Sequence, residues 1–273
     1  MDHLQRIQEE FTRQAGHFAS AQAVTHRDLV QRFADAVPVH GASVILDVAC
    51  GPGIITAALA PNAREVVAFD LTPEMLSKAR ERCGGAGLTN VTFREGSATD
   101  LPFADASFDV VVTRLSIHHF LAPARPLAEM ARVLKRGGTL VLADVVSSEA
   151  AEESTLHNAI EILRDPSHVR MLPASELVAL IEAAGLTIER ETTWDEGREF
   201  EEWVRIVDDP DRVAPLRTVV RTLAGLGQHA GTGLALAGGK IVFFHRWMLI
   251  VARKPEATLP LRVATGRGPT SPE

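Results

Sequence analysis

The residues of this chain that could do chemistry are concentrated around position 50. Residues 43–48 are mostly apolar and predict a buried strand, and Gly51 and Gly53 follow it before a helical pattern at 54–60. A strand, a glycine-rich turn and a helix in this order open a nucleotide-binding βαβ unit. Glycines suit such a turn because a Cβ would block a ligand from approaching the backbone. The next apolar run, 66–69, ends in Asp70, where a carboxylate can accept both hydroxyls of a ribose.

An acid in this stretch argues against a dinucleotide as the ligand. Asp47 stands at the end of the first strand, where its charge would repel a pyrophosphate. A dinucleotide fingerprint also has a third glycine, whereas this chain has Ile54 and Thr56 after Gly53. A ligand without phosphate that carries a positive sulfonium and a positive ammonium would be favoured by the same carboxylate.

Residues 46–53 resemble motif I of the class I S-adenosylmethionine (SAM) methyltransferases, and further segments resemble that family in the same order. The likeness covers roughly residues 40–145. It is greatest to the branch that holds ubiquinone/menaquinone-type C-methyltransferases and many natural-product O- and N-methyltransferases (methyltransferase domain 11-like). The resemblance implies SAM as the cofactor. It also implies a set of cofactor-binding residues: Asp47, Gly51, Gly53 and Asp70, with Leu71 and Met75 packing on the adenine and Ser97 and Ala98 near its amino group.

One of the predicted cofactor residues departs from the family pattern, and the role of another is open. Ser97 stands where the family usually has an Asp for the adenine amino group; it can accept one hydrogen bond but carries no charge, and the backbone N–H of Ala98 remains available there. Arg114, after the fourth predicted strand, could anchor the methionine carboxylate or an acidic substrate, and a solvated surface arginine is the alternative.

His118 and His119 are the candidate catalytic residues. They follow the fourth strand, at the expected mouth of the pocket, and imidazole titrates near neutral pH. Adjacent residues cannot both face one point, so one is expected to be a general base or substrate anchor and the other a packing residue. We favour His119 slightly, because the second His of such a pair is the more regular one in the resembled family. Three residues of the presumed lid are weaker candidates: His157, Asp165 and His168.

The resemblance implies an α/β fold, with a Rossmann-like seven-stranded sheet of order 3-2-1-4-5-7-6, strand 7 antiparallel, helices on both faces and a helical substrate cap. Later strands are expected at 91–94, 109–113, 139–143, 186–193 and 242–251, and helices at 73–82, 124–134, 152–163, 175–184, 199–207 and 214–226. We divide the chain into N-terminal helices over the active site (1–40), a SAM-binding domain (41–254) and a disordered tail (255–273). Cap insertions are expected at about 150–174 and 195–240.

Composition narrows the class of partner. The net charge of −7, from 28 Lys+Arg against 35 Asp+Glu, and the absence of a basic block argue against nucleic acid. Cys50 and Cys83 are the two cysteines, and without a CxxC they argue against a zinc site or a disulfide framework, so we expect no metal. No apolar run has the length of a membrane span and residues 1–15 lack a signal-peptide core, so we expect a cytoplasmic protein without membrane insertion. A homodimer is left open.

These patterns predict an enzyme, a SAM-dependent methyltransferase that acts on an O, N or C nucleophile of a small metabolite or natural product. The alternative is a SAM-binding protein of the same fold that catalyses a non-methylating rearrangement or serves as a binding module, because it would keep the same cofactor motifs. Methylation of amino groups in nucleic acids is disfavoured, since residues 113–116 are not the Asn/Asp-Pro-Pro-aromatic motif of that branch. The sequence identifies neither the acceptor nor the atom that is methylated.

Overall fold

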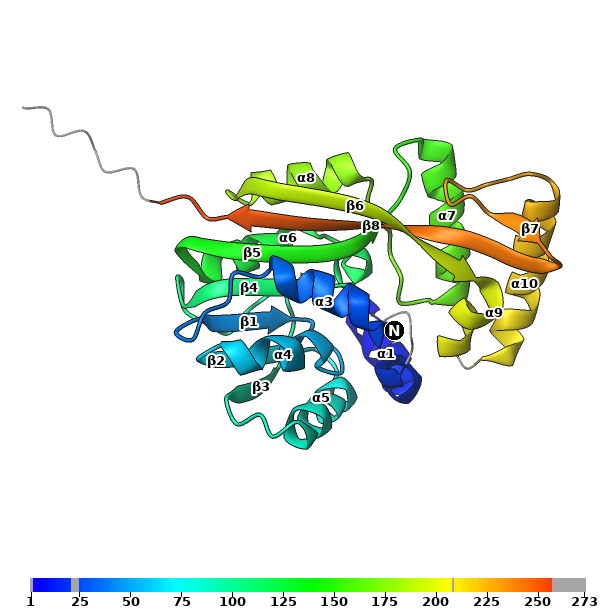
Figure 1. The fold of residues 1–273 in the computed structure, drawn as a ribbon. Helices are drawn as coiled ribbons and strands as arrows, with labels where there is room; N and C mark the ends of the chain where they lie inside the picture. Colours follow the sequence, from blue (N-terminus) through cyan, green and yellow to red (C-terminus); the bar gives the residue numbers. More distant parts are fainter. Residues whose placement is uncertain (1, 21–24, 208, 257–273) are drawn as a thin grey trace, which may run out of the picture.

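The computed structural model describes residues 2–20, 25–207 and 209–256, and in this part of the chain eight strands form one sheet (Figure 1). Their bounds are β1 (Val44–Val48), β2 (Glu65–Asp70), β3 (Val91–Glu95), β4 (Phe108–Arg114), β5 (Leu134–Val146), β6 (Thr187–Glu199), β7 (Ala235–Ala237) and β8 (Lys240–Arg253).

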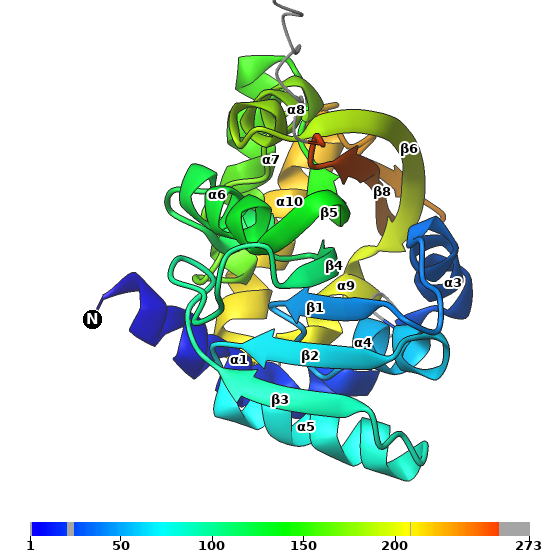
Figure 2. The same ribbon diagram turned by 90° about the vertical axis from the view of Figure 1, so that its left-hand side faces the viewer.

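The strand order is β3-β2-β1-β4-β5-β8-β6, which Figure 2 shows from one end of the sheet to the other. Strands β1 to β5 pair in parallel, and β8 runs antiparallel to both β5 and β6. The predicted order is therefore confirmed, with β8 as the expected seventh strand. The short strand β7 pairs with β8 as an addition to that plan. The order reverses between β1 and β4, and ligands of such sheets bind beyond the carboxyl ends of the strands at this point.

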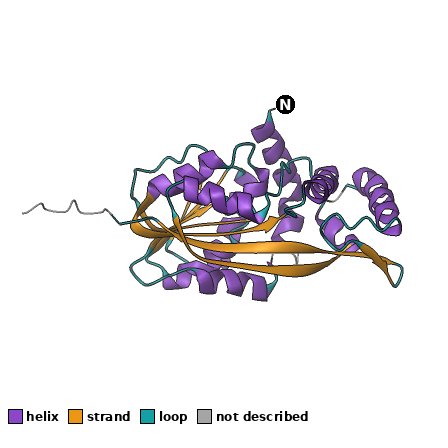
Figure 3. Ribbon diagram, turned by 90° about the horizontal axis from the view of Figure 1, so that it is seen from above, coloured by secondary structure: helices purple, strands orange, loops and turns teal. Residues whose placement is uncertain are grey.

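Helices cover both faces of the sheet (Figure 3). Successive side chains of β1 point to opposite faces of the sheet, and both faces are buried: Ile45 belongs to one apolar cluster, whereas Leu46 and Val48 belong to another. The first cluster takes in α3 (Arg27–Ala36) and α4 (Ile54–Leu59), with η1 (Ala60–Asn62) at its end. The second takes in α6 (Ala124–Val133) and α8 (Ala174–Ala183). Helix α5 (Pro73–Gly85) lies beside β2 and β3.

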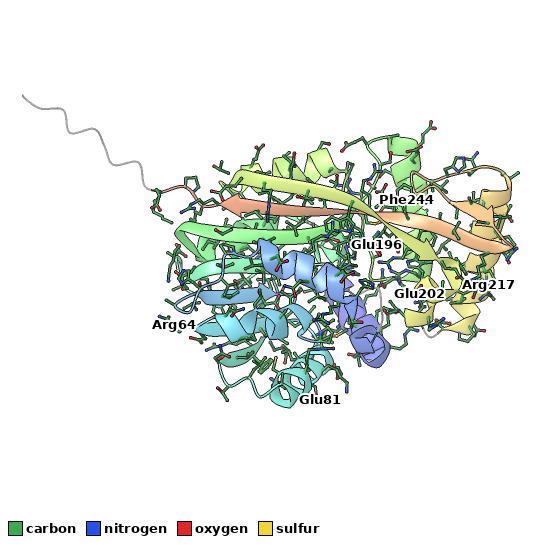
Figure 4. All side chains as sticks on the ribbon, viewed as in Figure 1. Arg64, Glu81, Glu196, Glu202, Arg217 and Phe244 are labelled. Atoms are coloured by element: carbon green, nitrogen blue, oxygen red, sulfur yellow. The ribbon has the colours of Figure 1, made fainter. Side chains whose placement is uncertain are left out.

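Strands β6 and β8 extend past the body of the sheet and carry a further group of elements, at the right of Figure 1. Their pairing continues to Glu199 and Val242, so the sixth strand is longer than the predicted 186–193. The group contains α7 (Ala151–Arg164), α9 (Phe200–Trp203), η3 (Val204–Ile206), α10 (Pro210–Gly225) and β7. We call it the cap. It has its own apolar cluster, which includes Ile160, Trp203 and Leu216. Figure 4 labels Glu202 and Arg217 on the cap, Arg64 at the opposite end of the molecule and Glu81 on α5.

Some predicted boundaries were wrong for local reasons. The helix expected at 124–134 ends at Val133, and β5 begins at once with Leu134, which pairs with Phe108. The helix expected at 199–207 consists of the short helices α9 and η3. Helix α1 (His3–Ser20) is the first of the N-terminal helices expected within 1–40. Residues 21–24 lie outside the described residues, as does the predicted tail from 257 onward. In the described part of the chain, no helix combines the length and apolar character needed to cross a membrane.

Candidate functional site

The loop between β1 and α4 gives its two glycines different roles. Gly51 and Gly53 both have left-handed backbones, with φ of 52° and 72°. A Cβ on Gly53 would lie 2.8 Å from the Cβ of Ala79, so this glycine allows α4 and α5 to approach closely. A Cβ on Gly51 would have no atom within 4 Å, and Gly51 lines the large cavity described below whereas Gly53 does not. Of the two glycines predicted to contact the cofactor, only Gly51 borders the space that a ligand could occupy.

The carboxylate of Asp70 is fixed at the end of β2 by backbone donors. The N–H of Gly51 donates to its Oδ2 at 2.8 Å, and the N–H of Thr72 donates to its Oδ1 at 2.9 Å. An ionised carboxylate has about four acceptor positions, and the N–H of Leu71 and the hydroxyl of Thr72 also lie within reach of this one. Burial raises the pKa of Asp70 to about 6, because the charged form is poorly solvated there.

Asp47 provides a second buried carboxyl at the end of β1. Its Oδ2 accepts a hydrogen bond of 2.5 Å from Oγ1 of Thr56. Burial raises the pKa of Asp47 to about 7, and the nearby charge of Asp70 adds to the increase. Two carboxyl groups with raised pKa values on one cavity wall favour a ligand that carries positive charge, since such a ligand would stabilise their ionised forms.

These carboxyl groups face a cavity of about 990 Å³ between helix α1 and the carboxyl ends of the central strands. Every residue predicted to bind the cofactor, except Gly53, lines it: Asp47, Gly51, Asp70, Leu71, Met75, Ser97, Ala98 and Arg114. Leu4, Ile7 and Phe11 of α1 close the other side. Helix α1 is held there in part by Gln8, whose side-chain amide donates to the carbonyl oxygen of Leu71 at 3.0 Å.

Arg114 belongs to the cavity wall rather than to the solvated surface. Its guanidinium lies over the ring of Trp247, 5.3 Å from the ring centre, in a cation–π contact. Burial lowers the pKa of Arg114 to about 10, with the charge of Asp47 acting in the opposite direction. The solvated alternative for this residue does not describe the structure.

A second cavity, of about 670 Å³, lies between the first cavity and the cap. The two share Phe11, Leu115 and His119 on their walls. The second cavity is further lined by side chains of the sheet, of the loop after α7 and of the cap: His118, Asp165, His168, Glu161, Arg164, Arg198, Trp203 and His245 among them. The predicted cofactor residues therefore line the first cavity, and the cap residues line the second cavity, which adjoins it.

His118 lines the second cavity and is oriented by a buried acid. Its Nδ1 lies 2.6 Å from Oδ1 of Asp144, and Asp144 also accepts the backbone N–H groups of Ile117 and Val145, each at 2.7 Å. Burial alone would lower the pKa of His118, but the charge and hydrogen bond of Asp144 raise it above its ordinary value. The pKa of Asp144 is lowered in turn, since His118 and the backbone donors outweigh the effect of burial.

His119 has a different environment at the junction of the two cavities. Its Nδ1 lies 3.1 Å from the carbonyl oxygen of Ser167, and its ring packs edge-on against Phe11 with 5.0 Å between ring centres. Burial, together with the neighbouring His118, lowers the pKa of His119 to about 4. Both imidazoles nevertheless line the second cavity, with 4.3 Å between their ring centres, so the pKa values and partners distinguish them rather than the direction they face.

Sequence reasoning missed Asp144 as a functional residue, although the signal was present. It ends the apolar run at 139–143, as Asp47 ends the first strand. Strands β4 and β5 are parallel neighbours, so an acid at the end of β5 lies beside the residues that follow β4. That rule places Asp144 near the residues that follow β4, although it does not say which of the two imidazoles Asp144 contacts.

The geometry agrees with comparisons to known proteins. The methyltransferase domain model Methyltransf_11 matches residues 46–142. A candidate methyltransferase of Bacillus halodurans C-125 has the same fold with a TM-score of 0.78 and 31% identity, over 83% of this chain and 98% of that one. YcgJ of Bacillus subtilis, an uncharacterized methyltransferase, is 34% identical over 161 residues, 59% of this chain and 64% of YcgJ; its structure gives a TM-score of 0.78.

A third relative links the chain to the quinone branch. The demethylmenaquinone methyltransferase of Deinococcus radiodurans is 42% identical over 105 residues, which are 38% of this chain and 43% of that enzyme. The likeness to this relative thus covers less than half of its length. The chain belongs to the class I SAM-dependent methyltransferases, in the family of the Methyltransf_11 domain. SAM is the cofactor that this family implies.

Proposed function

We propose that this enzyme transfers the methyl group of SAM to an O, N or C nucleophile of a small-molecule acceptor bound in the second cavity. The observation that carries the proposal is the pair of adjoining chambers: one is lined by the cofactor residues, and the other by His118 and the cap. The net charge of −7 supports a small acceptor rather than a nucleic acid, and we infer a cytoplasmic enzyme.

The first cavity fits SAM in its donor set and its lining. Its walls combine apolar side chains with a few polar groups, as is usual for small-molecule sites. Asp70 would accept the ribose hydroxyls, Leu71 and Met75 would pack on the adenine, and Asp47 would face the positive groups. SAM, when bound, supplies an electrophilic methyl group on a sulfonium sulfur.

His118 is our preferred general base, in place of His119. Most of the catalysis in a methyl transfer comes from alignment in a dry pocket, and a base is needed only where the nucleophile carries a proton. With its Nδ1–H donating to Asp144, a neutral His118 keeps an unprotonated Nε2 that can accept that proton. The lowered pKa of His119 makes it a weak base, and its position suits packing between the chambers.

We further propose that the cap, at about 150–174 and 195–240, selects the acceptor, while α1 covers the cofactor. Arg198 lines the second cavity, and its buried Nε has no hydrogen-bond partner among the described residues. A buried donor without a partner is unfavourable, so an acceptor with an oxygen-rich or acidic group would fit this wall.

The proposal is tested by supplying SAM with a trideuteromethyl group to the purified enzyme, together with a size-fractionated cell extract. Methyl transfer to a small acceptor should give a metabolite that is heavier by one trideuteromethyl group, with S-adenosylhomocysteine formed in equal amount. The His118→Gln variant serves as the control for chemistry in the second cavity. Label in protein or nucleic acid, or SAM that is bound but never consumed by any fraction, would contradict the proposal, and the second result would favour the non-methylating alternative.

A further inference from the structure

Three side chains that can ligate a metal meet where α7 packs against β8. His157 and Glu161 are four residues apart on α7 and therefore share one face of the helix, and His245 comes from β8. Nε2 of His245 lies 2.9 Å from Oε1 of Glu161, and Nε2 of His157 lies 3.8 Å from the same oxygen. The three donor atoms lie within 4.8 Å of one another, and all three residues are buried.

One of these atoms lacks a partner in the described part of the chain. Nε2 of His157 is buried without a hydrogen bond, because 3.8 Å is too long for one. The two imidazole rings are nearly parallel, with 23° between their planes and 5.8 Å between their centres. A buried polar atom without a partner is unfavourable, and a cation held between the three donors would supply the missing contact.

We propose that His157, Glu161 and His245 bind a divalent transition-metal ion of the zinc and iron(II) type. Two imidazoles and one carboxylate are the donor set of catalytic zinc sites and of non-haem iron sites, whereas magnesium and calcium prefer oxygen ligands. With metal–ligand bonds of about 2.0–2.2 Å, donor atoms in a tetrahedral site lie about 3.3–3.6 Å apart. The contact of His157 with Glu161, now 3.8 Å, would therefore shorten, and that of His245 with Glu161, now 2.9 Å, would lengthen.

The neighbours of the cluster are compatible with this role. Nε of Arg164 donates to Oε2 of Glu161 at 3.1 Å, which fixes the carboxylate and leaves Oε1 toward the two imidazoles. Such outer partners commonly orient metal ligands. Arg164 and Arg198 also place positive charge on the cavity wall, so they disfavour a bare cation and favour an anionic oxygen as its further ligand.

Glu161 and His245 line the second cavity, so the open position of the ion would face the space assigned to the acceptor. The ion would then hold an acceptor oxygen or a water molecule on the cap side. That role rests on the proposed function, whereas the binding of the ion does not. The sequence-based expectation of no metal rested on the cysteines and did not consider a carboxylate and an imidazole that lie 84 positions apart.

The test measures metal binding by the full chain, without any activity assay. After dialysis against a chelator, Zn²⁺ is titrated in competition with a chromophoric chelator, and Co²⁺ absorption reports the geometry of the site. The wild type should bind one ion per chain. His157→Gln and His245→Gln keep a polar amide near Glu161 but lose the imidazole, and each should weaken Zn²⁺ binding at least about a hundredfold, since losing an outer partner alone costs about 10–100-fold.

His40→Gln is the matched control, because it removes an exposed imidazole from a distant loop and should leave the affinity unchanged. SAM binding and thermal melting check that each variant is folded. If the Gln variants do not fold, His157→Cys should instead give a Co²⁺–thiolate absorption band. Failure of the folded wild type to bind Zn²⁺ and Co²⁺, equal binding by His245→Gln, or a folded His157→Cys without that band would overturn the proposal.

Discussion

Replacing Asp70 with Ala should weaken SAM binding strongly, because it removes the carboxylate assigned to the ribose. The carboxylate is 8% exposed and is held by the N–H groups of Gly51 and Thr72, so it is already fixed in position before a ligand arrives. The ribose hydroxyls are assigned to its two carboxylate oxygens, which accept hydrogen bonds. The cofactor therefore gains two charge-assisted bonds without the cost of ordering the side chain.

Each such bond contributes about 1.5–3 kcal/mol, and about 1.4 kcal/mol corresponds to a tenfold change in affinity. Loss of both should raise the Kd for SAM at least about a hundredfold. The same change leaves two backbone N–H groups of the loop without their acceptor, which costs about 1–3 kcal/mol of folding stability for each buried donor. The variant should therefore melt at a lower temperature and must be assayed well below that temperature.

Isothermal titration calorimetry at pH 7.5 measures the affinity, and circular dichroism confirms that the variant is folded. Glu95→Gln is the control, because Glu95 pairs with Asp70 across β2 and β3 but is exposed and outside the cavity. It removes one negative charge from the same edge of the sheet and should change the affinity little. A folded Asp70→Ala variant with an affinity within twofold of wild type would refute the assignment of this carboxylate to the ribose.

Two further predictions concern the same cavity. Gly51→Ala puts a methyl group into the open space of the cavity and should abolish SAM binding, with only about 1–2 kcal/mol of backbone strain. Gly53→Ala, whose Cβ would meet α5, should mainly lower the melting temperature. The reverse pattern would contradict the different roles assigned to the two glycines. Burial raises the pKa values of Asp70 and Asp47 to about 6 and 7, so the folded protein binds more protons than the unfolded chain between about pH 4 and 7. The stability that these groups contribute is therefore lost as the pH rises through that window, while SAM, which favours the ionised forms, should bind more tightly. Melting curves and calorimetry from pH 5.5 to 8 should show both trends, and a SAM affinity that is independent of pH would contradict the role of the carboxylates.

The strand order and most of the cofactor cavity could be predicted because several local patterns, in order along the chain, resemble those of a known family. The run that ends in Asp47, the turn with Gly51 and the run that ends in Asp70 each combine an apolar strand with one polar residue at its end. Parallel pairing then brings these ends to the same edge of the sheet. Asp47, Gly51 and Asp70 follow from these patterns, whereas Leu71, Met75, Ser97 and Ala98 follow from the resemblance to the family.

The second cavity could not be predicted in the same way, because its residues come from elements that are far apart in the sequence. The pairing of Glu161 with His245 depends on how α7 meets the extended end of β8. The choice between His118 and His119 depends on which imidazole reaches Asp144, a contact that spans 26 positions. Gly53 shows a different limit, since its close contact with α5 cannot be told from a ligand contact in the sequence.

The most direct test of the account is the pH–rate profile of methyl transfer to the identified acceptor, measured for wild type, His118→Gln, His119→Gln and Asp144→Asn. The pKa of His118 is raised above its ordinary value of 6.5. Wild-type turnover should therefore decrease as the pH is lowered, and the midpoint of this acid limb should lie above pH 6.5. His118→Gln should lose about 10²–10⁴ in turnover together with that limb, with SAM affinity preserved. Asp144→Asn should move the limb to lower pH, and His119→Gln should keep it. If His118→Gln retains wild-type turnover and an unchanged acid limb from pH 6 to 9, His118 is not the base and the central claim is wrong.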